Sequence, residues 1–137
     1  MKHDFGEIED GFMFVSSQPE CANSAILNRK TGKIYYTSSF GDSDKLPRDI
    51  EDDEKYIGIP HKNDLELGKG LVFEFVQNKI PNEIEIVEGF FSHRGAYSNY
   101  KNYLSKINKL EEWYEFENKA QENALREWCK ENNIEIK

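Results

Sequence analysis

One short segment holds the residues whose types and spacing best suit binding chemistry. Arg94 stands at a predicted helix start, where unpaired backbone N–H groups and the positive end of the helix dipole favour anions. A guanidinium group at such a place can hold a carboxylate or a phosphate through two parallel hydrogen bonds. Tyrosine rings that follow at helical spacing can stack on the bases of single-stranded nucleic acid. The candidate residues for binding an anionic ligand or single-stranded nucleic acid are His93, Arg94, Tyr97, Tyr100 and Lys101.

The same segment also has a purely structural interpretation. Its two tyrosines share one helical face with Leu104 and Ile107, a pattern typical of rings that pack in a core with their hydroxyl groups at the rim. Arg94 can equally pair with Glu88, or with a carboxylate of the last helix such as Glu115. The sequence leaves both interpretations open.

Carboxylates gather in a second segment, between Asp42 and Glu54, where seven acidic residues stand against only Lys45 and Arg48. The segment lacks the alternating oxygen ligands, the central glycine and the terminal glutamate of an EF-hand loop, so a solvated loop is predicted rather than a metal site. Such a loop attracts a basic protein partner, and salt screens that attraction. The predicted acidic partner surface consists of Asp49, Glu51, Asp52, Asp53 and Glu54.

The residue types that usually carry catalysis are scattered along the chain. His3, His61 and His93 have neither an HExxH pattern nor paired-histidine spacing, and the sequence has no nucleophile elbow and no phosphate-binding loop. We therefore predict a protein that is not an enzyme and uses no metal and no cofactor. An enzyme with His93 as base and Arg94 as anion clamp is the less favoured alternative.

Size and composition indicate one globular domain. The chain has 137 residues, of which 13% are aromatic, and disordered chains lack aromatic residues in that proportion. A net charge of −8 argues against binding to duplex DNA. Cys21 and Cys129 form neither a metal spacing nor a disulfide framework, which predicts reduced thiols in the cytoplasm. No apolar run approaches the ~20 residues of a membrane span, so no membrane association is expected.

Periodicity predicts a helix and a small sheet in residues 1–62. Apolar residues recur at helical spacing from Asp4 to Val15. Residues 25–28 and 33–37 predict a β-hairpin in which Gly32 supplies the positive φ of the turn. Residues 56–59 are a candidate third strand, which gives a sheet that a helix can cover on one face.

Helices are predicted in residues 63–137, and polar residues suggest where they start. Asn63 with Glu66, and Asn82 with Glu85, have the spacing of capping boxes. Ser92 is the predicted cap of a third helix.

The last predicted helix, residues 111–132, has the clearest amphipathic pattern. Trp113 and Trp128 fall on its apolar side and are expected to anchor the core. A face wider than the domain can cover would instead mark a homodimer or partner surface. The predicted fold is α+β in a single domain of residues 1–137, with the helix and sheet in 1–62 and the helical half in 63–137.

The strings HRGAYSNYKNYL and EEWYEFENKAQENALREWCKENNIE resemble the C-terminal signature of a family of short, acidic bacterial proteins. That family is catalogued only as an uncharacterised protein family. LNRKTGKIYY resembles its hairpin, and YIGIP resembles its strand that ends in proline before a helix. The resemblance covers nearly the whole chain. It implies this fold and this cellular setting, and it implies no activity.

The predicted function is that of a small cytoplasmic bacterial protein that binds another protein, as a binding or adaptor module. The acidic loop would face the partner. The alternative is an anionic-ligand or single-stranded nucleic-acid binder that uses the surface around Arg94.

Overall fold

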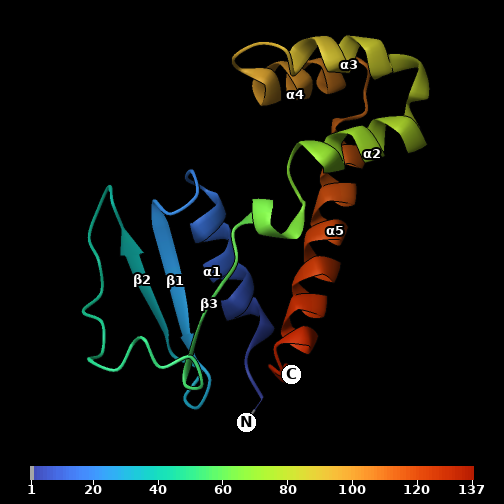
Figure 1. Ribbon diagram of the computed structural model, residues 1–137. Helices are drawn as coiled ribbons and strands as arrows, with labels where there is room; N and C mark the ends of the chain where they lie inside the picture. Colours follow the sequence, from blue (N-terminus) through green and yellow to red (C-terminus); the bar gives the residue numbers. More distant parts are fainter. Residues whose placement is uncertain (1) are drawn as a thin grey trace. The chain divides into compact units, whose positions relative to one another are not determined.

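The computed structural model describes residues 2–137 (Figure 1). The chain forms two compact units. Unit 1 combines the N-terminal residues up to Leu65 with residues Glu122–Lys137, and unit 2 is Glu66–Gln121. A small antiparallel sheet in the N-terminal half and helices mostly in the C-terminal half confirm the predicted α+β class. The predicted division after residue 62 lies close to the boundary at Leu65, but residues 122–137 group with the sheet rather than with the helical half.

Unit 1 begins with helix α1 (Phe5–Ser16), which confirms the helix predicted from Asp4 to Val15. The helix starts where it does because the Asp4 carboxylate accepts a hydrogen bond of 2.8 Å from the Gly6 N–H, one of the donors that a helix start leaves unpaired. Its buried apolar stripe is the predicted one: Phe5, Ile8, Phe12 and Val15.

The sheet of unit 1 contains β1 (Asn23–Asn28), β2 (Ile34–Ser38) and β3 (Tyr56–Gly58) in the antiparallel order β2-β1-β3. This confirms the hairpin and the third strand. Gly32 in the hairpin turn has a φ of 80°, a value that glycine adopts without strain.

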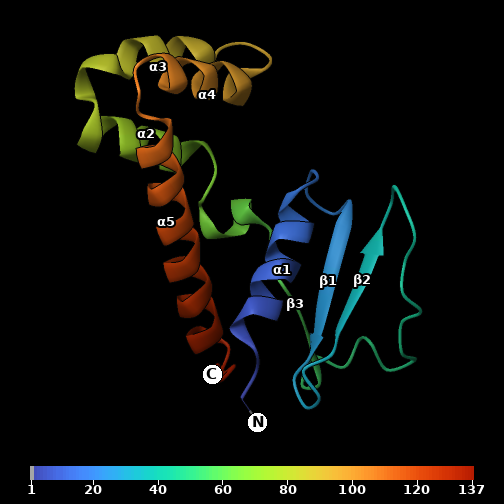
Figure 2. The same cartoon turned by 180° about the vertical axis from the view of Figure 1, so that it is seen from behind.

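Helix α1 lies along one face of the sheet in both views (Figures 1 and 2). The rings of Phe14 and Tyr36 meet edge to face with their centres 5.1 Å apart. Gly11 permits the close approach, because a Cβ atom there would lie 2.6 Å from Cδ1 of Ile59. Packing between helix and sheet therefore fixes β1 and the segments that follow it.

The C-terminal residues complete unit 1. Helix α5 (Leu110–Glu131) begins in unit 2 and ends in unit 1, where it buries Leu125 and Cys129. Trp128 is only half-buried, so its predicted role as a core anchor is wrong. In the part of α5 that belongs to unit 1, the buried side chains are Leu125 and Cys129 in place of Trp128.

Unit 2 consists of helices. They are α2 (Lys69–Lys79), α3 (Ile84–Phe90), α4 (Ala96–Lys106) and the first half of α5, with the short 3₁₀ helix η2 (Pro81–Glu83) before α3. Trp113 is 1% exposed and confirms the predicted core anchor. Its ring meets those of Phe75 and Tyr100 at centre distances of 5.4 and 5.2 Å.

The three predicted helix caps are wrong. Asn63 lies inside a 3₁₀ helix, η1 (Lys62–Leu65), and α2 starts only after Gly68, without a side-chain cap. Asn82 lies in η2, and the cap residue of α3 is Glu83. Ser92 donates its hydroxyl hydrogen bond back to the Glu88 carbonyl, while α4 is preceded by Gly95. The 3₁₀ turns that precede α2 and α3 displace both helix starts from the positions that the spacing predicts.

Within residues 2–137, no helix combines the length and the apolar character that crossing a lipid bilayer requires.

Candidate functional site

The turn between α3 and α4 presents the first group of predicted site residues. His93 and Arg94 are exposed there, and Gly95 closes the turn with a φ of 72°. Ion pairs among residues 2–137 join Lys55 to Asp49, Lys109 to Glu112 and Arg126 to Glu122. Arg94 thus forms no ion pair within that part of the chain, and the suggested pairing with Glu88 or Glu115 is not formed. Its guanidinium group remains accessible to a ligand.

The two tyrosines of the predicted site have different surroundings. Tyr97 is 38% exposed, and its ring meets Phe91 edge to face at 5.1 Å. Tyr100 is 0% exposed, so its ring cannot stack on a ligand, and its assignment to a binding surface is corrected to a core role. Burial, followed by the nearby Glu117 carboxylate, raises the pKa of both phenols above the ordinary value of 10.0.

Lys101 is half-buried, and its ammonium group lies 5.8 Å from the ring centre of Tyr114, which is 40% exposed. On α2, Lys69 lies 5.9 Å from the ring centre of Phe91. Each of these two cations therefore lies near an aromatic ring, of which Tyr114 is exposed and Phe91 is half-buried. The sequence alone did not indicate Lys69 or Tyr114, because they come from helices other than the one that carries Lys101.

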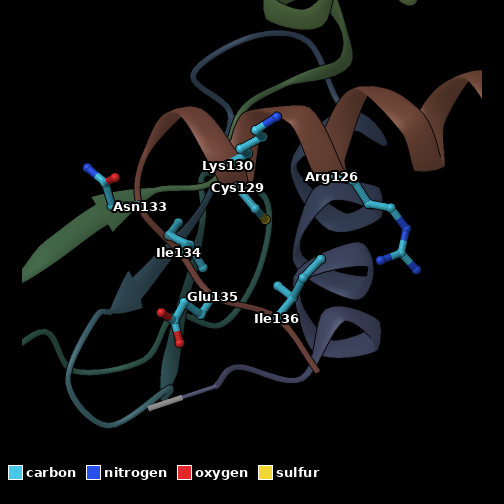
Figure 3. Close-up of a pocket in the computed structure, with 7 residues that line it drawn as sticks. All are labelled: Arg126, Cys129, Lys130, Asn133, Ile134, Glu135 and Ile136. Carbon is cyan, nitrogen blue, oxygen red and sulfur yellow. The ribbon is translucent and has the colours of Figure 1, made fainter.

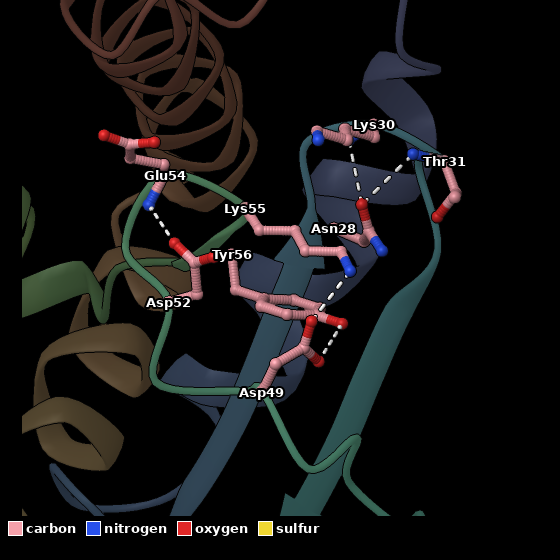
Figure 4. A network of polar contacts seen from close by, with 8 residues as sticks. All are labelled: Asn28, Lys30, Thr31, Asp49, Asp52, Glu54, Lys55 and Tyr56. Carbon is pink, nitrogen blue, oxygen red and sulfur yellow. Dashed lines mark hydrogen bonds and ion pairs between the residues drawn. The ribbon is translucent and has the colours of Figure 1, made fainter.

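The second predicted surface, the acidic loop of residues 42–54, is anchored to the sheet by one of its own carboxylates (Figure 4). Asp49 accepts a hydrogen bond of 2.7 Å from the Lys55 ammonium group and one of 3.0 Å from the Tyr56 hydroxyl. The bond from Lys55, and then the bond from Tyr56, lower the pKa of Asp49. Burial and the bond to Asp49 raise the pKa of Tyr56. Asp49 thus holds the loop in place.

The loop also closes the outer edge of β2. The Tyr36 N–H donates to the Asp44 carboxylate at 2.8 Å, and the Asp44 N–H donates to the Tyr36 carbonyl at 2.8 Å. The Ser38 N–H donates to the Ser43 hydroxyl at 3.0 Å. The loop is exposed at Ser43, Asp44 and Asp49, as predicted for a solvated loop, but Ser43 and Asp44 also occupy hydrogen-bonding groups of the edge strand β2.

The remaining predicted carboxylates form what we call the acidic turn, residues Glu51–Glu54. All four side chains are exposed. Asp52 shapes the turn, since its carboxylate accepts a hydrogen bond of 3.0 Å from the Glu54 N–H (Figure 4). None of the four takes part in an ion pair within the described chain. They are negative charges held on a folded turn and open to solvent.

We predict that Asp49→Asn loosens the loop and lowers the pKa of Tyr56 toward 10.0, because the amide carries no charge to oppose phenolate formation. Spectroscopic titration of the tyrosines measures that change.

The Asp49→Asn variant is also expected to be less stable than the natural protein at neutral pH. A carboxylate whose pKa folding lowers contributes stability above its unfolded pKa and loses it as the pH falls through the folded value. The stability difference should therefore vanish in acid.

Asp53→Asn is the matched control for this prediction, because Asp53 is exposed and makes no hydrogen bond or ion pair in the described residues. Equal effects of the two substitutions on the tyrosine titration would contradict the role assigned to Asp49.

A hollow of about 340 Å³ lies in unit 1 at the end of α5 (Figure 3). Arg126 lines it, but its guanidinium group is held by Glu122 and lies 4.2 Å from the ring centre of Phe5. Cys129 also lines the hollow, and burial raises the pKa of its thiol. A thiol that stays protonated is a poor nucleophile, so this hollow does not supply activated-cysteine chemistry.

A second hollow of unit 1, of about 270 Å³, brings together Cys21, His61 and Asp64. These are the residue types of a catalytic triad, yet their hydrogen bonds are used differently. The His61 Nε2–H donates to the Gln18 carbonyl at 2.8 Å, and Nδ1 accepts from the Asn63 N–H at 3.1 Å. Both ring nitrogens are therefore occupied by the backbone, and His61 cannot accept a proton from Cys21. Over the described residues, no group of three or more side chains could hold a metal ion.

Most of the chain matches the model of a known protein family. The model of the Uncharacterised protein family (UPF0158) matches residues 14–137. The chain belongs to this family. The match spans the whole sheet and all helices after α1, so it bears out the resemblance seen in the sequence. No curated protein and no solved structure is similar enough to the chain to count as a match. The description of this family names no activity. The surfaces described above are therefore the basis for a proposed function.

Proposed function

We propose that this chain is a small cytoplasmic, non-catalytic protein that acts as an adaptor by binding a basic surface of another protein through the acidic turn. The single observation behind the proposal is the state of Glu51–Glu54: four consecutive exposed carboxylates that form no ion pair within the described chain, on a turn that Asp49 and Asp52 hold in shape. A surface that is already ordered loses little conformational freedom when it binds.

The distribution of charge supports the same proposal. Unit 1, which contains the acidic turn, has 17 acidic and 11 basic residues, whereas unit 2 has nine and seven. The excess negative charge of unit 1 attracts basic partners and speeds their association, and the attraction weakens as salt screens it.

The alternative of an anionic-ligand or single-stranded nucleic-acid binder takes second place. The surface for such a ligand would consist of His93, Arg94, Tyr97 and Lys101, because Tyr100 is buried in the core. Fewer accessible rings mean less stacking energy, since each stacked base contributes about 1–3 kcal/mol.

The test compares tagged forms of the protein in affinity captures from a bacterial lysate, each split into nuclease-treated and untreated halves. The binding variant neutralises the acidic turn through Glu51→Gln, Asp52→Asn, Asp53→Asn and Glu54→Gln. The control changes the net charge equally at four exposed positions of unit 2, through Glu85→Gln, Glu88→Gln, Glu111→Gln and Glu115→Gln.

We expect one protein to be retained by the natural chain and the control, to be lost with the neutralised turn, and to withstand nuclease. Its recovery should fall as salt increases. Equal retention by both variants would refute the role of the acidic turn. Partners that disappear with nuclease would support the alternative at Arg94.

A further inference from the structure

The two edge strands of the sheet in unit 1, β2 and β3, differ in whether the backbone groups on their outer edges have hydrogen-bond partners. On β2, the backbone groups of Tyr36 and Ser38 that point away from β1 are occupied by Asp44 and Ser43. Exposed edges of a sheet invite pairing with another chain, and this loop prevents such pairing on the β2 side.

On β3, the hydrogen bonds to β1 show which groups point outward. The Ile59 N–H donates to the Ala25 carbonyl, and the Lys55 carbonyl accepts from the Arg29 N–H, both at 2.8 Å. Because strand residues alternate, the N–H and C=O of Gly58 face away from β1. In the part of the chain that the structure describes, neither group has a hydrogen-bond partner.

Gly58 is also physically accessible. It is exposed, and a Cβ atom built on it would have no neighbour within 4 Å. The Tyr56 carbonyl points to the same side, while the Tyr56 N–H is occupied by the Asp52 carbonyl at 2.9 Å. The open stretch therefore runs from the Tyr56 carbonyl to the Gly58 carbonyl, with the acidic turn at its start.

Negative charge lies at both ends of this open edge. The acidic turn precedes β3 directly, and Lys55 next to it is already paired with Asp49. At the other end, the hollow of about 270 Å³ is lined by Gly58 together with the acidic residues Glu20 and Asp64. A strand that carries lysine or arginine on alternate residues matches this distribution, because it brings cations toward both ends.

We propose that the outer edge of β3 binds a basic, extended segment of another protein as an added strand, with the segment's backbone paired to Gly58. The Gly58 N–H donates to a carbonyl of the segment, and the Gly58 carbonyl accepts from one of its N–H groups. Basic side chains of the segment reach the acidic turn on one side and the hollow at Glu20 and Asp64 on the other. This inference rests on the proposed function and specifies the form of the partner.

The test measures calorimetric binding of a synthetic nine-residue peptide of alternating lysine and threonine to the full chain. Gly58→Pro removes the outward N–H but no hydrogen bond to β1, a place where edge strands tolerate proline. Gly58→Ala is the matched control, because it keeps the N–H and its methyl group meets no neighbour within 4 Å. We expect Gly58→Ala to bind like the natural protein, and Gly58→Pro to bind roughly tenfold or more weakly, as the loss of about 1.4 kcal/mol implies.

A second measurement covers the case in which Gly58→Pro fails to fold, as judged by circular dichroism. The same peptide, N-methylated on alternate residues, is titrated into the unaltered protein. One of the two methylation registers should abolish binding, and unchanged binding of both would overturn the proposal. Equal binding of an alternating glutamate and threonine peptide would overturn its basic character.

The experiment separates this inference from the proposed function. If neutralising the acidic turn abolishes peptide binding while Gly58→Pro does not, strand addition is refuted and the acidic-turn function stands. If Gly58→Pro alone abolishes binding, strand addition stands and the acidic turn is not its contact. Sedimentation that reports a dimer of the natural chain and a monomer of Gly58→Pro would assign the edge to a second copy and overturn the proposal.

Discussion

Replacing Trp113 by alanine is expected to lower the free energy of unfolding by about 3–5 kcal/mol. Trp113 is 1% exposed, and its ring contacts those of Phe75, Tyr100 and Phe116 with centres 5.4, 5.2 and 6.3 Å away. Removing it leaves a cavity among rings that cannot all move to fill it, and it ends three aromatic contacts at once. Urea unfolding followed by circular dichroism measures the loss.

Trp128→Ala is the matched control, because it removes the same side chain from a half-buried position on the same helix. We expect its effect to be clearly smaller, since the indole loses less buried contact. Equal losses for the two substitutions would contradict the assignment of Trp113, and not Trp128, to the core.

Short-range patterns explain which parts of the fold the sequence predicts. Helix α1 and the hairpin follow from local rules: an aspartate cap, an apolar residue on every third or fourth position, and Gly32 at a turn that needs positive φ. The failed caps at Asn63 and Asn82 used equally local rules. They failed because Asn63 and Asn82 each lie inside a 3₁₀ helix, and the α-helix starts only after it, so neither residue stands at an α-helix start.

The candidate sites show the same limit more strongly. The sequence identified Asp49 as one more exposed carboxylate, yet its role depends on Lys55 and on the Tyr56 hydroxyl, which the folded loop brings to it. Tyr100 looked available for stacking because helical spacing identifies a face without saying what covers it. The open edge at Gly58 depends on strand order, which no single segment encodes.

Tyr100→Phe is expected to raise the free energy of unfolding by about 1–3 kcal/mol, although it removes a polar group from the natural protein. The Tyr100 hydroxyl is buried and has no hydrogen-bond partner among residues 2–137, so folding removes it from water without a compensating bond from these residues. Phenylalanine keeps the ring and its contact with Trp113. Thermal or urea unfolding at neutral pH measures the gain.

The gain should increase in alkaline solution. Burial raises the pKa of Tyr100, so the unfolded chain releases this proton at a lower pH than the folded chain does. The natural protein therefore loses stability as the pH rises above 10.0, and the variant, which has no proton to release there, is spared that loss.

Tyr103→Phe provides the contrast, since the Tyr103 hydroxyl donates to the Glu83 carboxylate. It should lower stability at neutral pH. A destabilised Tyr100→Phe would mean that its hydroxyl has a partner, such as a buried water, that compensates it.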